Sequence, residues 1–113
     1  MVEGLINFSD WQKTDFRVGK VISVEAHPNA DKLYVLKVDL GELRERTLVA
    51  GLKDFYSKED LEGKIVIVFV NLEPAVLRGV KSEGMLLAAD DAENGKIALL
   101  QPDKEIKLGS KIR

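Results

Sequence analysis

The hydrophobic and polar positions of this chain alternate in short runs, which is the pattern of half-buried β-strands. The first run covers residues 16–25. Its apolar positions share one parity and predict a buried face made by Phe16, Val18, Ile22 and Val24. Lys20 interrupts that parity beside Gly19, and a glycine at such a point predicts a bulge. The chain is therefore expected to enter its sheet through a bent strand.

Further apolar runs predict the rest of the sheet. The run over residues 33–40 alternates, and its buried face is predicted to hold Tyr34, Leu36, Val38 and Leu40. The other predicted strands are residues 46–50, 64–70, 85–89 and 96–100. The strand over 64–70 is apolar on both faces. Asn94-Gly95 predicts a hairpin between the last two strands.

Two short helices are predicted from their capping residues. Ser57 is expected to cap a helix over residues 57–63, because acidic residues fill the first turn and Gly63 stands at its end. Near the start of the chain, Ser9-Asp10-Trp11-Gln12 fits a capping box that opens a second short helix.

Three strands, a short helix and two more strands follow the order of an OB-fold. The fold class is therefore expected to be all-β, a five-stranded Greek-key barrel with a C-terminal β extension. A chain of 113 residues predicts a single domain over 1–113. Residues 1–13 and 91–113 exceed what the barrel needs and predict a buried interface, most economically in a homodimer. The alternative is that the tail folds over its own barrel.

Composition places the chain among folded proteins, with 45% hydrophobic and 32% charged residues. The longest apolar run, residues 65–70, is too short to span a bilayer, so no membrane contact is expected. The first residues lack the basic segment and long apolar stretch of a signal peptide, and the chain has no cysteine. These features favour a cytoplasmic protein.

The charge balance limits which partners the chain can bind. Seventeen basic residues stand against nineteen acidic ones, which gives a net charge of −2. A non-specific nucleic-acid binder is usually strongly basic. Any site for a polyanion must therefore be a local patch.

Catalytic and metal chemistry have few residues to use. The single histidine lies beside a proline and no cysteine is present, so a metal site with several such ligands is not expected. Gly79 and Gly84 do not have the spacing of a phosphate-binding loop. Asp90 and Asp91 are neighbours on a strand, so their carboxylates point to opposite faces. The sequence predicts a protein that is not an enzyme and holds no cofactor or metal.

Polar and basic residues concentrate in two segments at strand ends, His27-Pro28-Asn29-Ala30-Asp31-Lys32-Leu33-Tyr34 and Leu77-Arg78-Gly79-Val80-Lys81-Ser82-Glu83-Gly84-Met85. In a small barrel, two such segments can share one rim. A rim is where a barrel keeps its binding chemistry, because packing already fills the core. The alternative is that both are ordinary solvated turns.

With three further motifs, these segments resemble the tRNA-binding domain family. The further motifs are Phe16-Arg17-Val18-Gly19-Lys20-Val21, Val49-Ala50-Gly51-Leu52 and Val70-Asn71-Leu72-Glu73-Pro74. The resemblance covers about residues 14–113. Such domains occur in methionyl-tRNA synthetases, in stand-alone structure-specific tRNA-binding proteins and in endothelial monocyte-activating polypeptide. The resemblance implies an OB-fold that recognises tRNA by shape, as a dimer or as a module of a synthetase.

A tRNA surface requires cations for phosphates, donors for hydroxyl groups and an apolar contact for a base or ribose. The residues expected to bind RNA are Asn29, Lys32, Arg78, Lys81, Ser82 and Met85. Arg78 is the strongest candidate, because it lies between Leu77 and Gly79, where the backbone can approach a ligand closely. The patch can be widened by Arg17, Lys20 and Lys37.

Plainer interpretations of these residues stay open. Asn29 can simply shape its turn, and Lys32 and Lys81 can be solvated surface. Met85 begins a strand and can belong to the core. Trp11 can stack on a base or pack under the N-terminal helix.

The expected function is a non-catalytic, structure-specific tRNA-binding protein, acting free or as the β subunit of methionyl-tRNA synthetase. Its expected partners are tRNA, a second copy of the chain and a synthetase catalytic chain. The alternative is a protein-binding dimer of the chaperone type on the same barrel. Salt separates the two, because RNA binding weakens with ionic strength and an apolar peptide groove does not.

Overall fold

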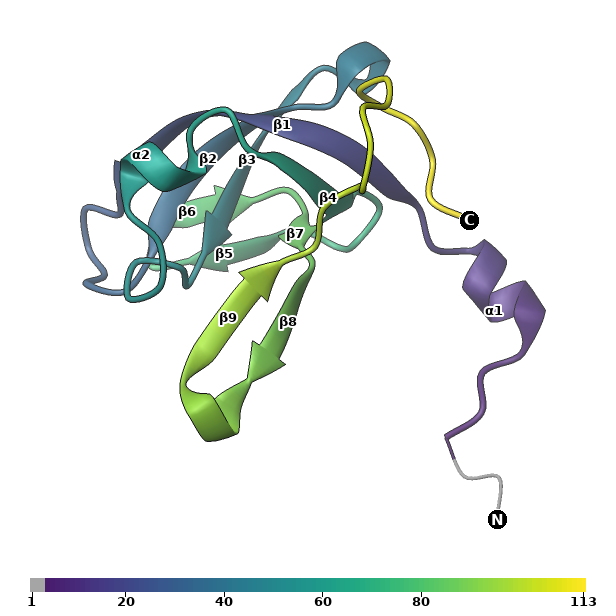
Figure 1. Ribbon diagram of the computed structural model, residues 1–113, viewed down its shortest axis with the longest axis horizontal. Coiled ribbons are helices and arrows are strands. Elements are labelled where there is room, and N and C mark those ends of the chain that lie inside the picture. The colour runs from purple at the N-terminus through teal and green to yellow at the C-terminus, as the bar shows by residue number, and fades with distance from the viewer. Residues whose placement is uncertain (1–3) are drawn as a thin grey trace.

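A computed structural model describes residues 4–113 as an antiparallel barrel with two added hairpins (Figure 1). The barrel strands are β1 (Phe16–Ala26), β2 (Tyr34–Asp39), β3 (Glu45–Ala50), β4 (Ile65–Phe69) and β7 (Met85–Leu86). The hairpin strands are β5 (Ala75–Leu77), β6 (Val80–Ser82), β8 (Ala88–Asp91) and β9 (Lys96–Leu99). The helical elements are α1 (Phe8–Gln12), α2 (Lys58–Leu61) and the 3₁₀ turns η1 (Gly41–Leu43) and η2 (Ala92–Asn94).

The five barrel strands follow the order β3-β2-β1-β4-β7, and the sheet nearly closes between its two edges. The amide of Glu83 donates to the carbonyl of Thr47 at 2.8 Å. The amide of Val49 donates to Oγ of Ser82 at 3.0 Å. The Arg46 guanidinium donates across the same gap to the carbonyls of Val70 and Glu83. These contacts close the barrel and confirm the predicted OB-type fold.

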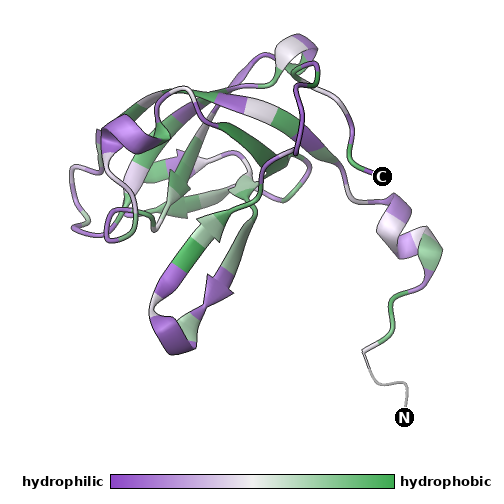
Figure 2. Ribbon diagram, viewed as in Figure 1, coloured by the Kyte–Doolittle hydropathy of each residue, from purple (hydrophilic) through white to green (hydrophobic). Residues whose placement is uncertain are grey.

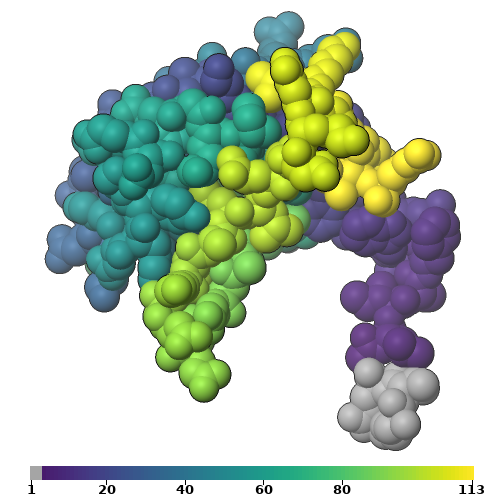
Figure 3. All heavy atoms as spheres, in the orientation of Figure 1, coloured from purple at the N-terminus to yellow at the C-terminus, as the bar shows by residue number. Residues whose placement is uncertain are grey.

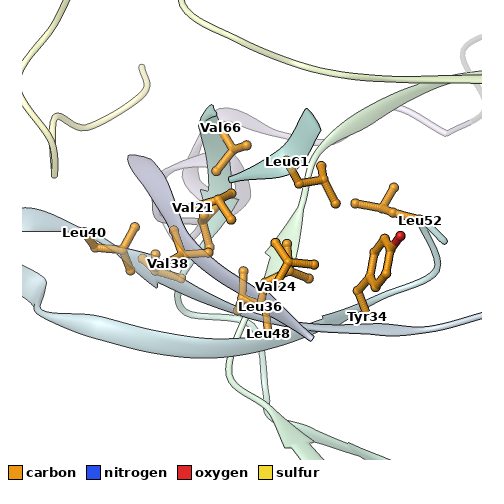
Figure 4. Packing of buried hydrophobic residues seen from close by; sticks show 12 residues of the cluster. Val21, Val24, Tyr34, Leu36, Val38, Leu40, Leu48, Leu52, Leu61 and Val66 are labelled. Atoms are coloured by element: carbon orange, nitrogen blue, oxygen red, sulfur yellow. The ribbon is translucent and has the colours of Figure 1, made fainter. Parts of the chain in front are cut away.

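One cluster of apolar side chains fills the barrel (Figure 4). The predicted buried face of β2 is confirmed, with Tyr34, Leu36, Val38 and Leu40 all buried. Leu61 reaches this cluster from α2, and Ser57 caps that helix as predicted by accepting a hydrogen bond from the amide of Asp60 at 3.1 Å. Figure 2 shows hydrophobic residues along the barrel strands and hydrophilic ones at the end of the β8–β9 hairpin.

The predicted buried face of β1 is correct at Val18 and Val24 and wrong at Ile22. The bulge lies between Val21 and Ser23, where the register with β2 shifts, and not beside Lys20. Ile22 is the extra residue of this bulge and is 44% exposed, whereas Val21 before it and Val24 after it are buried in the core, because the extra residue shifts the alternation by one position. Gly19 has another reason to be glycine, since a Cβ there would lie 2.6 Å from the side chain of Val38.

The cap of α1 also differs from the prediction. Asn7, not Ser9, is the N-cap, because its Oδ1 accepts from the amide of Asp10 at 2.9 Å. Ser9 instead donates its hydroxyl to the same Asn7 oxygen at 2.7 Å. The helix therefore begins two residues earlier than the capping box predicted.

The single strand predicted over residues 85–89 is divided in two. β7 pairs with β4, Leu87 donates its amide to Ile67, and β8 then leaves the barrel to pair with β9. The predicted hairpin is present, but Ala92–Asn94 form a 3₁₀ turn and Gly95 follows in the left-handed conformation. The hairpin is the C-terminal β extension expected from the sequence.

The end of the chain folds back along the first half of β1. The amides of Gly109 and Ile112 donate to the carbonyls of Val18 and Phe16 at 2.8 and 2.9 Å. Arg17 holds this tail with a hydrogen bond to the carbonyl of Gly109 and binds the Asp15 carboxylate with two nitrogens. The hydrogen bond to Asp15 raises the pKa of Arg17 above its ordinary value. Arg17 is therefore occupied in the fold.

Candidate nucleic-acid interface

The two polar segments meet at one end of the barrel, as the sequence predicted. Figure 1 shows the loop between β1 and β2 (residues 27–33) at the end of β1 far from α1. The buried His27 joins this loop to the end of β5, because its Nε2 lies 2.8 Å from the carbonyl oxygen of Leu77. Its Nδ1 lies 2.9 Å from the amide nitrogen of Asn29. We refer to this loop together with the β5–β6 hairpin as the rim.

The β5–β6 hairpin presents Arg78 at its tip. Leu77 and Val80 are paired, so Arg78 and Gly79 form a two-residue turn between them. Both have positive φ, 52° and 90°, as the hairpin turn of type I′ requires. Positive φ is uncommon for arginine, and the hairpin geometry sets it here. The Arg78 side chain is exposed, and no residue of 4–113 forms an ion pair with it.

Asn29 and Lys32 lie on the opposite side of the rim, in the β1–β2 loop. Both are exposed, and Asn29 uses only its backbone amide to bind His27. The Lys32 ammonium lies 3.3 Å from the Asp54 carboxylate, and both side chains are more than half exposed. An exposed pair of this kind holds its partners weakly, so Lys32 can exchange Asp54 for a phosphate.

Lys81 and Met85 follow Arg78 along the chain and are both exposed. Lys81 stands opposite the exposed Val76 in the hairpin. Met85 is 45% exposed and lines a mainly apolar hollow of about 300 Å³ with Phe55 and Leu86, so it is not a core residue. Its unbranched thioether can adapt to the face of a base.

Ser82 differs from the other predicted residues because it is buried. Its Oγ accepts from the amide of Val49 at 3.0 Å and donates to the carbonyl of Gly84 at 3.1 Å. The hydroxyl proton is thus used inside the protein. We assign Ser82 to barrel closure and leave it out of the interface proposed below.

The residues expected to widen the patch lie away from the rim or are occupied. Lys20 lies in the first half of β1, opposite Asp39, and Lys37 lies within β2. Arg17 holds the tail, as described above. Trp11 packs on Phe16, with ring centroids 5.7 Å apart, at the other end of β1. The rim cations are therefore Lys32, Arg78 and Lys81.

Other chemistry has little support in the described part of the chain. Within residues 4–113, no group of three or more His, Cys, Asp or Glu side chains is placed to share a metal ion. The Asp91 carboxylate accepts hydrogen bonds from Asn94 in the hairpin connection. No helix among these residues has the length and apolar character needed to cross a bilayer.

Sequence reasoning missed the role of His27. It considered the residue only as a metal ligand, whereas both ring nitrogens are engaged within the rim. Nothing in the local sequence reveals a partner fifty residues away, so only the fold could identify this contact.

The fold and this rim define an OB-type barrel with a cationic loop surface. The family model described as "Putative tRNA binding domain" matches residues 16–111, and the chain belongs to this family.

Relatives of the chain occur in archaeal methionine–tRNA ligases. It is 63% identical over 108 residues to the ligase of Pyrococcus horikoshii and 58% identical over 110 residues to that of Nanoarchaeum equitans. These matches cover 96% and 97% of the chain but only 14% of either ligase, so the chain spans a small part of the relatives' length.

Solved structures of similar size share the whole fold. A protein described as related to methionyl-tRNA synthetase, from Pyrococcus horikoshii, superposes with a TM-score of 0.87 at 38% identity, covering 96% of this chain and 98% of that one. The chaperone CsaA from Bacillus anthracis gives a TM-score of 0.86 at 34% identity, covering 97% and 100%. The fold alone therefore does not separate RNA binding from protein binding.

Proposed function

We propose that this chain binds folded tRNA through the rim, recognising its shape, and contributes no catalysis of its own. The observation that carries the proposal is the set of exposed cations, Lys32, Arg78 and Lys81, on two segments that His27 joins. Lysine and arginine bind the phosphate backbone, which fixes position on an RNA without reading its sequence. Asn29 adds an amide for phosphate or 2′-hydroxyl groups, and Met85 adds an apolar contact.

Membership of the tRNA-binding domain family and similarity to methionine–tRNA ligases support tRNA as the ligand. We infer that the chain acts in the cytoplasm, free or as the β subunit of a methionyl-tRNA synthetase. In either setting, it would raise the local concentration of tRNA for a catalytic chain. The net charge of −2 keeps the attraction local to the rim, so we expect modest affinity from the isolated module.

The test is binding of a folded tRNA at two salt concentrations, with an RNA duplex as competitor and the Arg78→Ala protein as comparison. With about three to five phosphate contacts, log affinity should fall with log salt at a slope of roughly −0.7 to −0.9 per contact. The Arg78→Ala protein should bind about tenfold more weakly, as expected for one lost charged hydrogen bond. Absence of tRNA binding at low salt would overturn the proposal.

A protein-binding role of the chaperone type is the second candidate. The similarity to CsaA and the apolar hollow beside Met85 and Phe55 favour it. Binding of an apolar peptide should resist salt, and Phe55→Ser, which removes apolar area without adding a charge, should weaken it while leaving tRNA binding through the cations in place. The same salt series therefore separates the two functions.

We further propose that a second copy of the chain covers the exposed N-terminal segment. Leu5, Ile6 and Phe8 are 76%, 74% and 70% exposed, which is unusual for three large apolar side chains in one short segment. Ile6, Phe8 and Trp11 also line a hollow of about 490 Å³. Figure 3 shows this segment projecting away from the body of the barrel.

Light scattering over a range of concentrations tests the dimer. We expect twice the chain mass, and we expect Phe8→Asp to return the protein to a monomer because it places a charge in the apolar contact. Ile22→Asp is the matched control, since Ile22 is also an exposed apolar residue but lies on β1. A wild-type protein that is monomeric at every concentration would contradict the dimer.

A further inference from the structure

His27 is the only histidine of the chain, and it is 5% exposed. Its ring makes one hydrogen bond with each of the two segments of the rim. Nε2 lies 2.8 Å from the Leu77 carbonyl oxygen, and Nδ1 lies 2.9 Å from the Asn29 amide nitrogen. These two contacts come from residues fifty and two positions away in the chain, so the ring joins a distant hairpin to its own loop.

The two partners determine which ring nitrogen carries the proton. A carbonyl oxygen can only accept, so Nε2 must donate to Leu77. A backbone amide can only donate, so Nδ1 must offer its lone pair to Asn29. The bound ring is therefore the neutral Nε2–H tautomer. Both nitrogens are used, which leaves none for a metal or for proton transfer.

The hairpin needs such a contact to hold its tip in place. β5 and β6 have three residues each, and an isolated hairpin of two strands is marginal in water. Ser82 anchors the barrel end of this hairpin through Val49, but the tip lies at the other end of β6. The Leu77 carbonyl precedes Arg78 directly, so the contact with His27 fixes the backbone from which Arg78 projects.

We propose that His27 is a positioning residue for tRNA recognition, an inference that rests on the proposed function. It sets the arrangement of Arg78 relative to Asn29, so that both side chains meet the same stretch of RNA backbone. A preorganised pair binds more tightly, because less conformational entropy is lost when the RNA arrives. His27 itself does not touch the RNA, since its ring is buried and fully bonded.

Three variants of His27 test its two hydrogen bonds, one to Leu77 and one to Asn29, separately and together. His27→Asn retains an oxygen near the position of Nδ1 for the Asn29 amide but cannot reach Leu77. His27→Gln retains a donor near the position of Nε2 for Leu77 but loses the acceptor for Asn29. His27→Phe keeps the ring and loses both hydrogen bonds. For tRNA binding we expect a loss of about two- to tenfold for each variant that loses one hydrogen bond and a larger one for His27→Phe.

A double-variant cycle tests whether the effect runs through Arg78. His27→Asn should weaken tRNA binding in the wild-type protein but change it little in the Arg78→Ala protein, because the residue being positioned is then absent. Leu61→Ala is the control for general destabilisation, since Leu61 is the residue of α2 that is buried in the core. It should lower the unfolding temperature and leave tRNA binding by the folded protein unchanged.

The tautomer gives a readout that does not depend on RNA. Because the chain has one histidine, the long-range proton–nitrogen NMR spectrum of its ring is unambiguous, and it should show a protonated Nε2 and an unprotonated Nδ1. The opposite tautomer would overturn the contact. Wild-type binding with undiminished binding by His27→Asn and His27→Phe would overturn the role of His27 alone. Absence of wild-type binding would overturn the proposed function and this role with it.

Discussion

The two ends of β1 carry different kinds of surface. At the Ala26 end, polar groups and cations surround a buried imidazole that bonds to backbone atoms. At the Phe16 end, the ring of Trp11 stacks on Phe16, which also contacts the tilted ring of Phe69, and large apolar side chains face solvent beside them. Hydrogen bonds are directional and fix the geometry at the Ala26 end, whereas the hydrophobic effect at the Phe16 end favours association without a preferred direction. A single strand thus separates the proposed recognition surface from the proposed assembly surface.

The largest effect is expected from reversing two positive charges at the rim, compared with reversing two positive charges elsewhere on the protein. Arg78→Glu with Lys81→Glu should weaken tRNA binding by about a hundredfold or more, because two attractive contacts become repulsive. The control protein carries Lys13→Glu and Lys104→Glu, which change the net charge by the same amount at residues away from the rim. Its loss of tRNA affinity should be far smaller. Fluorescence anisotropy with labelled tRNA measures both. Equal losses would show that overall charge, not the rim, determines binding.

Removal of the Ser82 hydroxyl sharpens the boundary between barrel closure and the rim. Ser82→Ala leaves the buried amide of Val49 without an acceptor, which should cost about 1–2 kcal/mol in the free energy of unfolding. Affinity for tRNA, measured on the folded protein, should not change. Ser110→Ala removes an exposed hydrogen bond from the Ser110 hydroxyl to the Lys107 carbonyl at the other end of β1, and it should lower the free energy of unfolding by less. A loss of affinity without a loss of stability would make Ser82 a direct RNA contact.

The smallest expected effect concerns the pair between Lys32 and Asp54. Asp54→Asn frees the ammonium of Lys32 and removes a negative charge near the rim, so tRNA affinity should rise about twofold at low salt. Stability should change by less than about 0.5 kcal/mol, because both side chains are exposed. Glu42→Gln, which removes the exposed partner of Lys107, should leave tRNA affinity unchanged. Titration of each variant with labelled tRNA measures both affinities, and equal affinities for the two variants would contradict the prediction.

Much of the barrel could be predicted from the sequence, because strand alternation is a local property. The buried face of β2 could be identified from four alternating apolar positions. The α2 helix could be identified from its cap Ser57, the acidic residues of its first turn and Gly63 at its end. The bulge in β1 was misplaced because Gly19 signals close packing as readily as a bulge. Only the pairing with β2 distinguishes the two.

The candidate site was predictable in position but not in detail. Turn residues and charge located both segments of the rim, and their meeting was expected for strand ends in a small barrel. The β5–β6 hairpin was not expected, because three-residue strands leave too short a pattern to detect. Burial of Ser82 and the contact of His27 with Leu77 depend on residues about thirty and fifty positions away, which no local pattern contains.

The folding-back of the tail has a practical consequence for handling the protein. Because Ile112 bonds to Phe16, the end of the chain lies at the same end of β1 as α1, and Figure 1 shows the C-terminus on that side. β1 has 11 residues, which at about 3.3 Å each separate this end from the rim by at most about 35 Å. A dye, a sensor chip or a fused enzyme attached at the C-terminus should therefore leave the rim open to the solution.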